Sequence, residues 1–196
     1  MPRWGEKIGN SYLEGGRLIS KPMDFSQKNF ASLPDLQNVL RAILFPEAVP
    51  QKQRFQQLTE KDYVFLRRYL SMLPRESQHP RYNAKEFPDN YAKFLLAGGP
   101  AGPLPPGVRI FNKIGQAYGF LIDNAYIVDL DRNVEFMLAA VIYVNADEVL
   151  NDDHYDYDTE GFPFLRNLGR AVYQHELQRP RRHVPDLGRF RLRYDE

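Results

Sequence analysis

One segment constrains the fold more than any other part of the sequence. It is GGPAGPLPPG at residues 98–107, and it contains four glycines and four prolines. Proline fixes φ and lacks a backbone donor, and glycine favours turns, so this segment excludes a continuous helix or strand. The hydrophobic period changes across it, from a helical to a strand-like spacing. The sequence therefore predicts a mainly helical segment at residues 1–99, a linker at residues 100–107, strands plus a helix at residues 108–178, and a basic tail at residues 179–196.

Capping signals predict helices in the first half. The sequence SLPD at residues 32–35 has the Ser-x-x-acid form of a capping box, and apolar residues at helical spacing predict a helix at residues 34–44. The sequence TEKD at residues 59–62 repeats the signal for a second helix. Asp89 is expected to cap a third, shorter helix that ends at Gly98. Five aromatic residues at helical spacing are expected to lie in the core: Tyr63, Phe65, Tyr69, Tyr91 and Phe94.

The second half predicts three consecutive strands and a final helix. The first strand begins near Val108, the second covers residues 120–130, and the third covers residues 134–144, with a hairpin loop at residues 131–133. The third predicted strand is almost wholly apolar, so we expect it to be buried on both faces. A helix at residues 162–177 presents an apolar stripe that can cover the sheet.

The predicted fold class is α+β, with an N-terminal helical part, three consecutive antiparallel strands, and a C-terminal helix packed on the sheet. After the last helix, arginine alternates with apolar residues at residues 189–194, which is typical of an edge strand or of a solvated extension. The arginines of the tail are expected to be solvated rather than to form a docking site.

Composition excludes several classes of function. The chain has 26 Lys+Arg and 25 Asp+Glu, for a formal net charge of +1, so no overall field favours nucleic acid or an anionic membrane. The absence of cysteine excludes disulfides, thiolate nucleophiles and cysteine-ligated metals. No apolar run approaches the roughly 18 residues of a membrane span, and no signal peptide is expected in this chain.

An acidic run at residues 151–161 raises the possibility of a calcium site. Asp156, Asp158, Glu160 and Gly161 copy the opening of an EF-hand loop, but its twelfth position is Asn167 rather than glutamate. Acids directly before a helix also complement the partial charge of its N-terminus, and we favour that role. The histidines lack the i, i+4 spacing of a helical metal site: His79, His154, His175 and His183.

The expected first strand carries the sequence FNKIGQAYG at residues 111–119, and ASLPDL at residues 31–36 opens the first helix. With this order of elements, residues 24–176 resemble the C-terminal portion of penicillin-recognising serine hydrolases, the family of the class A-like serine β-lactamases and the D,D-peptidases. KIG at residues 113–115 stands where the family has Lys-Thr/Ser-Gly, with isoleucine in place of the hydroxyl residue. The resemblance implies a partial β-lactamase/transpeptidase-like fold.

The resemblance also implies roles for four consecutive residues. Lys113 would be an electrostatic anchor for a substrate carboxylate, and Ile114 would line the substrate site without the hydroxyl group of the family. Gly115 would let the backbone approach a ligand closely. The Gln116 backbone N–H would be one of two oxyanion donors. No cofactor and no metal are implied.

The nucleophile of that family is a serine in a Ser-x-x-Lys motif, and no serine of this chain has lysine three residues on: Ser11, Ser20, Ser26, Ser32, Ser71 and Ser77. Glu6 and Glu14 lie near the place of a general-base loop, but their spacing identifies neither. One interpretation is therefore the C-terminal part of a hydrolase of the periplasm or cell envelope, acting on a β-lactam or a related cell-wall amide or ester. The alternative is a non-catalytic binding or interaction module that retains this architecture.

A last expectation concerns the edge of the sheet. In the family, the strand that corresponds to residues 134–144 has partners on both sides, and one of these would lie outside this sequence. The uncovered edge is a template for pairing with another strand. We expect it to be covered by a second copy of the chain, giving a homodimer with a continuous sheet, or by residues 189–194 as a substitute strand.

Overall fold

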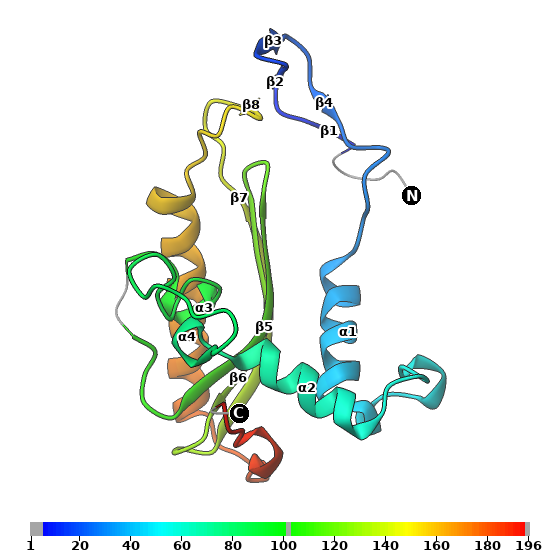
Figure 1. The fold of residues 1–196 in the computed structure, drawn as a ribbon, viewed down its shortest axis with the longest axis vertical. Coiled ribbons are helices and arrows are strands. Elements are labelled where there is room, and N and C mark those ends of the chain that lie inside the picture. Colours follow the sequence, from blue (N-terminus) through cyan, green and yellow to red (C-terminus); the bar gives the residue numbers. More distant parts are fainter. Residues whose placement is uncertain (1–5, 101–102, 195–196) are drawn as a thin grey trace.

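The centre of the molecule is an antiparallel sheet of three long strands. A computed structural model describes residues 6–100 and 103–194. In it, β5 (Val108–Ala117), β6 (Phe120–Asp129) and β7 (Val134–Tyr143) follow one another in the order β5-β6-β7. Figure 1 shows this sheet standing between α1 (Leu33–Leu44) and α4 (Phe162–Gln178). The predicted α+β class, the three antiparallel strands and the C-terminal helix are confirmed.

One face of the sheet packs against α4 and the short α3 (Phe94–Ala97). Leu165 and Tyr173 of α4 are buried there together with Ile110 of β5 and Ile127 of β6. Side chains alternate between the two faces of a strand, so the next residue of β5, Phe111, lies on the opposite face. There it belongs to a second apolar cluster.

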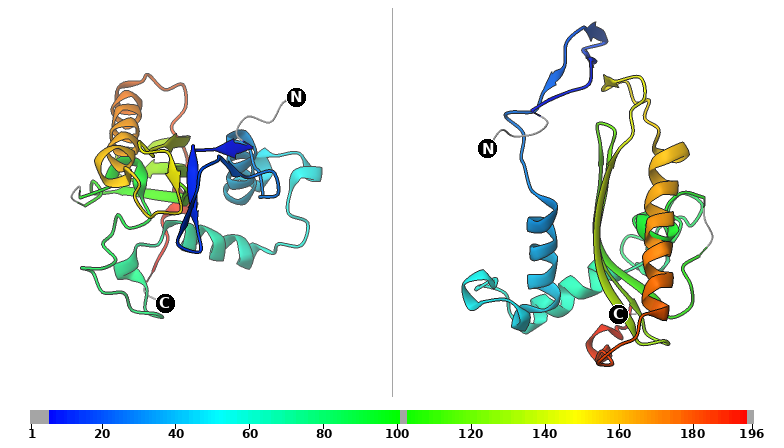
Figure 2. Two further views of the ribbon diagram at one scale, coloured as in Figure 1. Left: turned by 90° about the horizontal axis from the view of Figure 1, so that it is seen from above. Right: turned by 180° about the vertical axis from the view of Figure 1, so that it is seen from behind.

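This second cluster lies on the face toward α1, on the other side of the sheet from α4 (Figure 2). The C-terminal segment completes it. Seven buried residues form the cluster: Leu40, Leu44, Phe111, Tyr126, Val128, Leu187 and Phe190. α2 (Glu60–Ser71) contacts both β5 and α1.

Short strands form the N-terminal part of the described chain. β1 (Lys7–Ile8) pairs with β4 (Met23–Asp24), and β2 (Ser11–Glu14) pairs with β3 (Arg17–Ile19). On its other side, β2 pairs in parallel with β8 (Val149–Leu150), which follows the central sheet in sequence. This hairpin therefore connects the N-terminal region with the loop beyond β7.

The predicted caps of the first two helices are confirmed. Ser32 Oγ accepts a hydrogen bond from the backbone N–H of Asp35 at 3.1 Å. At α2, Thr59 Oγ1 accepts from the N–H of Asp62, and the Asp62 carboxylate accepts from the N–H of Thr59 at 2.7 Å. Each cap satisfies backbone donors that a helix leaves unpaired at its first turn.

The predicted third helix is wrong in its start and its length. Asp89 caps no helix; its carboxylate pairs with Arg75 Nη1 at 3.1 Å. Only residues 94–97 are assigned as helical, and the φ of Leu96 within them is +76°. The N–H groups of Phe94 and Leu95 at its start donate hydrogen bonds to the carboxylate of Asp123 in the sheet.

The prediction of five core aromatics is correct for Tyr63 and Phe94 alone. Phe65, Tyr69 and Tyr91 are each more than half exposed. The inward face of α2 is formed by positions 63, 67 and 71, at i, i+4 and i+8. The apolar pattern placed this face incorrectly because Arg67 and Ser71, both polar, are the residues that are buried.

The expectation that β7 is buried on both faces is wrong. It is an edge strand, and most of its residues are only partly buried. The strand buried on both faces is the central β6, although its sequence contains Asp123, Asn124 and Asp129. Residues of α3 and α4 cover one face of β6, and residues of α1 and of the C-terminal segment cover the other. Apolar content does not reveal which strand these elements will cover.

The C-terminal tail is neither an edge strand nor a solvated extension. Residues 188–190 form a 3₁₀ turn that buries Phe190. Arg189 pairs with Glu47 at 2.6 Å, and the guanidinium of Arg109 lies over the Tyr194 ring at 4.5 Å from its centroid. The tail is thus excluded as the substitute strand for β7.

The outer edge of β7 has no strand partner among the described residues, and Val141 near its end is 44% exposed. We predict that the chain by itself associates through this edge into a dimer, because unpaired N–H and C=O groups beside apolar side chains favour strand addition. Sedimentation velocity over a range of concentrations measures the association. Val141→Lys places a charge at the edge and is expected to yield monomer, whereas a wild-type chain that stays monomeric throughout contradicts the prediction.

Candidate functional site

The residues singled out in the sequence lie at the far end of β5, where the strand turns into β6. Ala117 pairs with Phe120, so Tyr118 and Gly119 form a two-residue turn, and both have positive φ, +54° and +80°. Two residues with positive φ match the twist of an antiparallel hairpin. The Gly119 N–H donates to the Tyr157 hydroxyl at 2.8 Å, which ties this turn to the segment before α4.

Lys113 is exposed on the face of the sheet that carries α1. Its ammonium donates to the backbone carbonyl of Ile114 at 2.7 Å. Directly opposite Lys113 in the register is Asn124 of β6, whose amide donates to the Leu36 carbonyl of α1 at 2.8 Å. The Asn124 carbonyl oxygen is buried and has no hydrogen-bond partner among the described residues. An ammonium with spare donors and an unsatisfied acceptor therefore lie on neighbouring strands.

The same face of the sheet is incompletely covered beyond Lys113. Val141 and Tyr143 of β7 project from this face and are 44% and 37% exposed. Val39 of α1 is also exposed. The second apolar cluster thus covers one end of the face, and Val141 and Tyr143 toward the other end remain partly open to solvent.

Gly115 and Gln116 continue the strand. A Cβ added to Gly115 would come within 2.7 Å of Ile122 Cγ2, so a larger residue here would have to displace the Ile122 side chain of the neighbouring strand. The Gln116 side chain is exposed and makes no hydrogen bond to any described residue. Its amide is therefore free to donate to and accept from a ligand.

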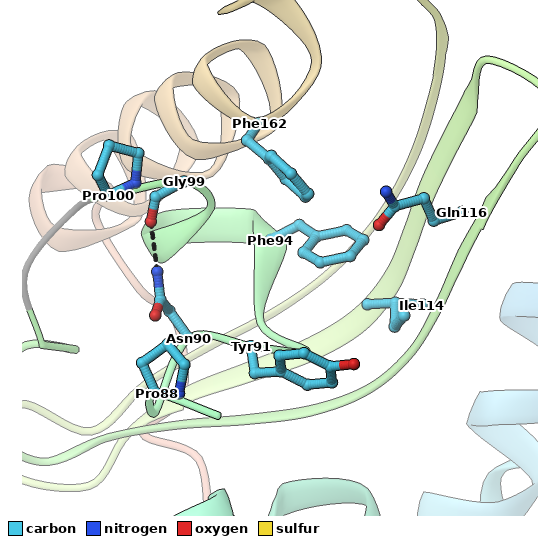
Figure 3. A pocket seen from close by; sticks show the side chains of 9 residues that line it. All are labelled: Pro88, Asn90, Tyr91, Phe94, Gly99, Pro100, Ile114, Gln116 and Phe162. Atoms are coloured by element: carbon cyan, nitrogen blue, oxygen red, sulfur yellow. Dashed lines mark hydrogen bonds between the residues drawn. The ribbon is translucent and has the colours of Figure 1, made fainter. Parts of the chain in front are cut away.

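A cavity of about 430 Å³ opens on the opposite face of β5, the face of Ile114 and Gln116. Figure 3 shows the rings of Phe94, Phe162 and Tyr91 around it, with Gln116 at one side. We call it the apolar cavity, because no charged side chain is among its lining residues: Pro88, Asn90, Tyr91, Phe94, Gly99, Pro100, Ile114, Gln116 and Phe162.

A second cavity of about 690 Å³ adjoins the first, and we call it the polar cavity. Tyr91, Ile114 and Gln116 line both cavities, so the two meet at the end of β5. Lys113 and Asp153 supply opposite charges to the polar cavity. Tyrosines form much of its remaining wall, with the full lining being Tyr91, Lys113, Ile114, Gly115, Gln116, Ala117, Tyr118, Asn151, Asp153, Tyr155 and Tyr157.

A buried polar network holds the wall of the apolar cavity in place. The Asp123 carboxylate accepts hydrogen bonds from the N–H groups of Phe94 and Leu95 at 3.0 and 2.9 Å. It also accepts from the Asn112 amide at 2.8 Å, and Asn112 in turn accepts from the Lys93 ammonium at 2.6 Å. The side chains of Lys93, Asn112 and Asp123 are almost entirely buried. The network therefore joins β5 and β6 to the turn that carries Phe94.

Burial shifts both ionisable groups of this network toward their neutral forms. It raises the pKa of the Asp123 carboxyl, although the hydrogen bonds from Leu95, Asn112 and Phe94 act in the opposite direction. It lowers the pKa of the Lys93 ammonium, and the charge of Asp123 partly counteracts that effect. Each charge thus depends on the other for its stability inside the protein.

The acidic run before α4 borders the polar cavity. Asp156 accepts from the Ala146 N–H at 2.8 Å, and the Tyr155 hydroxyl accepts from the Asn151 N–H at 2.9 Å. Asp158 and Glu160 lie in a π-helical turn, residues 157–161, that leads into α4. The N-cap residue of α4 is Gly161 and its first turn contains no acid, so the predicted role of these acids at the start of α4 is not confirmed. Within residues 6–100 and 103–194, no group of three or more His, Asp or Glu is arranged to hold a metal ion.

The sequence predicted the strand segment but not most of its surroundings. Lys113, Ile114, Gly115 and Gln116 are adjacent on β5, but Lys113 lies on one face and Ile114 and Gln116 on the other. The buried network and the aromatic walls of the apolar cavity were not predicted. The available signal was the pair Asp123-Asn124 inside an otherwise apolar strand, since buried polar residues need partners.

Among the described residues, none of the helices combines the length and the apolar character that crossing a bilayer requires. Comparison with protein-family models, with curated proteins and with solved structures finds no match to this chain.

Proposed function

We propose that this chain forms one wall of the site of a serine acyl-hydrolase similar to β-lactamases, acting on a β-lactam or a related cell-wall amide or ester. The observation that carries the proposal is the surroundings of Lys113. The exposed ammonium and the unsatisfied oxygen of Asn124 belong to paired residues of β5 and β6, uncovered apolar residues of β7 project from the same face, and the outer edge of β7 is open among the described residues. This combination is expected where a further segment, bearing the serine, completes the site.

In this proposal Lys113 supplies a fixed positive charge. Its ammonium has three donors and uses one on the Ile114 carbonyl, which leaves two for a substrate carboxylate. The outer edge of β5 has no strand partner among the described residues, so an extended amide can pair with it. The Gln116 N–H is proposed as one oxyanion donor, and a serine from outside the sequence as the nucleophile.

Ile114 sets this site apart from the family pattern. It has no hydroxyl group to donate to a carboxylate, and it packs against the apolar residues buried between the sheet, α3 and α4. The proposal therefore assigns carboxylate recognition to Lys113 alone. The periplasm or cell envelope is the proposed location, since the cell-wall substrates of this class are found there.

A non-catalytic binding module is the second candidate function. It is favoured by the lining of the two cavities, in which no described residue is serine or histidine. A chain of this kind would bind its ligand without forming or breaking a bond. Its test is incubation of the chain with a reporter penicillin followed by measurement of the intact mass. We expect no acyl adduct on this chain alone; a stoichiometric adduct on any of its serines contradicts this prediction.

The experiment for the proposed hydrolase is Lys113→Ala in a protein that includes the serine-bearing segment. We expect kcat/KM to fall by the equivalent of about 2–4 kcal/mol, the scale of one preorganised electrostatic contact, with little change in the melting temperature. Lys7→Ala is the matched control, because Lys7 is also exposed and also begins a Lys-Ile-Gly sequence. Equal activity of the Lys113 variant and the wild type overturns the role of Lys113.

A further inference from the structure

The apolar cavity has the properties of a pocket for a side group of a ligand. Its volume of about 430 Å³ lies within the range of roughly 300–1,000 Å³ of small-molecule sites. Phe94 and Phe162 meet edge to face, with ring centroids 4.9 Å apart, and Tyr91 adds a third ring. Rings so arranged favour a further aromatic ring over a saturated group of similar size.

The walls of this cavity are fixed before any ligand binds. Asp123 holds the backbone of Phe94 from the sheet side. On the other side, Arg166 of α4 donates to the Gly98 carbonyl at 2.7 Å, and the Asn90 amide donates to the carbonyls of Ala97 and Gly99. A cavity that needs no rearrangement loses little conformational entropy on binding.

The lining also defines the charge of the group that it accepts. None of its side chains is charged, and an unpaired charge in apolar surroundings is costly. Among the described lining residues, the polar side-chain groups are the amides of Asn90 and Gln116 and the Tyr91 hydroxyl, and the Gln116 amide makes no hydrogen bond to a described residue. An uncharged ring next to an amide group therefore fits the cavity, with the amide at Gln116.

We propose that the apolar cavity is a specificity pocket for an uncharged aromatic group of an amide ligand whose acidic end reaches Lys113. The inference deepens the proposed function, since the two cavities share Tyr91, Ile114 and Gln116 and one ligand can occupy both. The aromatic preference itself depends on the cavity and not on hydrolysis.

The test compares two uncharged probes, N-acetyl-phenylalaninamide and N-acetyl-alaninamide, by NMR titration of the isotope-labelled chain. We expect the dissociation constant of the phenyl probe to be lower than that of the methyl probe by a factor of about ten or more, because the cavity buries the aromatic ring. Its shift changes should be centred on residues 90–99, on β5 from Ile114 to Gln116, and on Phe162. Equal affinity of the two probes, or shift changes centred elsewhere, overturns the proposal.

Two variants separate the pocket from the rest of the protein. Gln116→Trp fills the mouth of the cavity from an exposed position, and the preference for the phenyl probe is expected to disappear. Phe162→Leu keeps an apolar wall but removes a ring, and the preference is expected to shrink several-fold. Asn167→Ala, an exposed change on the same helix, is the control. A preference that survives both pocket variants unchanged contradicts the inference.

The same titration keeps this inference distinct from the proposed hydrolase. N-acetyl-phenylalanine, which adds a carboxylate to the phenyl probe, is expected to gain affinity in wild type and to lose that gain in Lys113→Ala. If the carboxylate adds no affinity but the phenyl probe is still preferred, the proposed role of Lys113 is wrong and the proposed aromatic pocket is supported. If the gain is present without a phenyl preference, the pocket fails and the role of Lys113 stands.

Discussion

Asp123→Ala is expected to lower the free energy of unfolding by about 3–5 kcal/mol, the largest effect of any single change considered for this protein. The variant removes the acceptor for the N–H groups of Phe94 and Leu95 and for the Asn112 amide, all in the interior. It also removes the opposite charge that most strongly stabilises the buried Lys93 ammonium. The unsatisfied buried donors and the unpaired buried charge both lower the free energy of unfolding.

Urea unfolding followed by far-UV circular dichroism measures this change. Asp158→Ala is the control, because Asp158 is exposed and makes no hydrogen bond to a described residue, and its effect is expected to stay within about 0.5 kcal/mol. If the free energy of unfolding of the Asp123 variant lies within about 1 kcal/mol of the wild-type value, the size of an ordinary substitution effect, the network does not hold the turn at residues 94–97.

Gly169→Ala is expected to destabilise the protein by about 2–3 kcal/mol, although alanine is a better helix former than glycine by about 1 kcal/mol. Gly169 lies on α4 where the helix meets α3. A Cβ at this position would come within 2.6 Å of the Leu96 backbone nitrogen and within 3.1 Å of the Leu95 carbonyl carbon. Backbone atoms cannot move aside as a flexible side chain does, so the close packing outweighs the gain in helix propensity.

Asn167→Ala on the same helix isolates the propensity effect. Asn167 is exposed, and the substitution is expected to stabilise α4 by about 0.5 kcal/mol. Thermal unfolding of the two variants should therefore give shifts of opposite sign. A Gly169 variant that is as stable as wild type or more stable would mean that α4 and α3 are not in close contact.

Local signals in the sequence predicted most of the secondary structure. The caps at Ser32 and Thr59 each involve a residue three positions further on, so the start of each helix can be predicted from a few consecutive residues. The alternation of apolar residues predicted β5 and β6, and an apolar run predicted β7. The loop between β6 and β7 was predicted from three polar residues, and the structure places it at residues 130–133.

Long-range packing was predicted less well. The inward face of α2 depends on Tyr194, whose hydroxyl lies 2.7 Å from the Ser71 Oγ, and these residues are far apart in sequence. Phe190 was expected in a strand or in solvent, whereas it is 1% exposed in the second apolar cluster. A pattern within one segment indicates that a face is apolar, but not which distant residue will cover it.

At the candidate site, too, the local structure was predicted and the long-range contacts were not. The sequence predicted a strand with Lys113 near a turn, because lysine, glycine and the flanking apolar residues are consecutive. It did not predict Phe94, Phe162 and Asp123 near this strand, because three different elements bring them together. Asp123 was visible as a charge inside an apolar run, but two of its partners are the backbone N–H groups of Phe94 and Leu95, which carry no sequence signal.

The position of Phe190 and Leu187 also has a consequence for the order of folding during synthesis. These two residues complete the cluster on the α1 face of the sheet, and they follow every other member of that cluster in the chain. A ribosome releases the chain from its N-terminus, at about 5–20 residues per second, so α4 and the sheet emerge while that face is still open. The nascent chain is therefore expected to expose Phe111, Tyr126 and Val128 until residues 187–190 leave the ribosomal tunnel, and chaperone binding to that face is expected to end at that point.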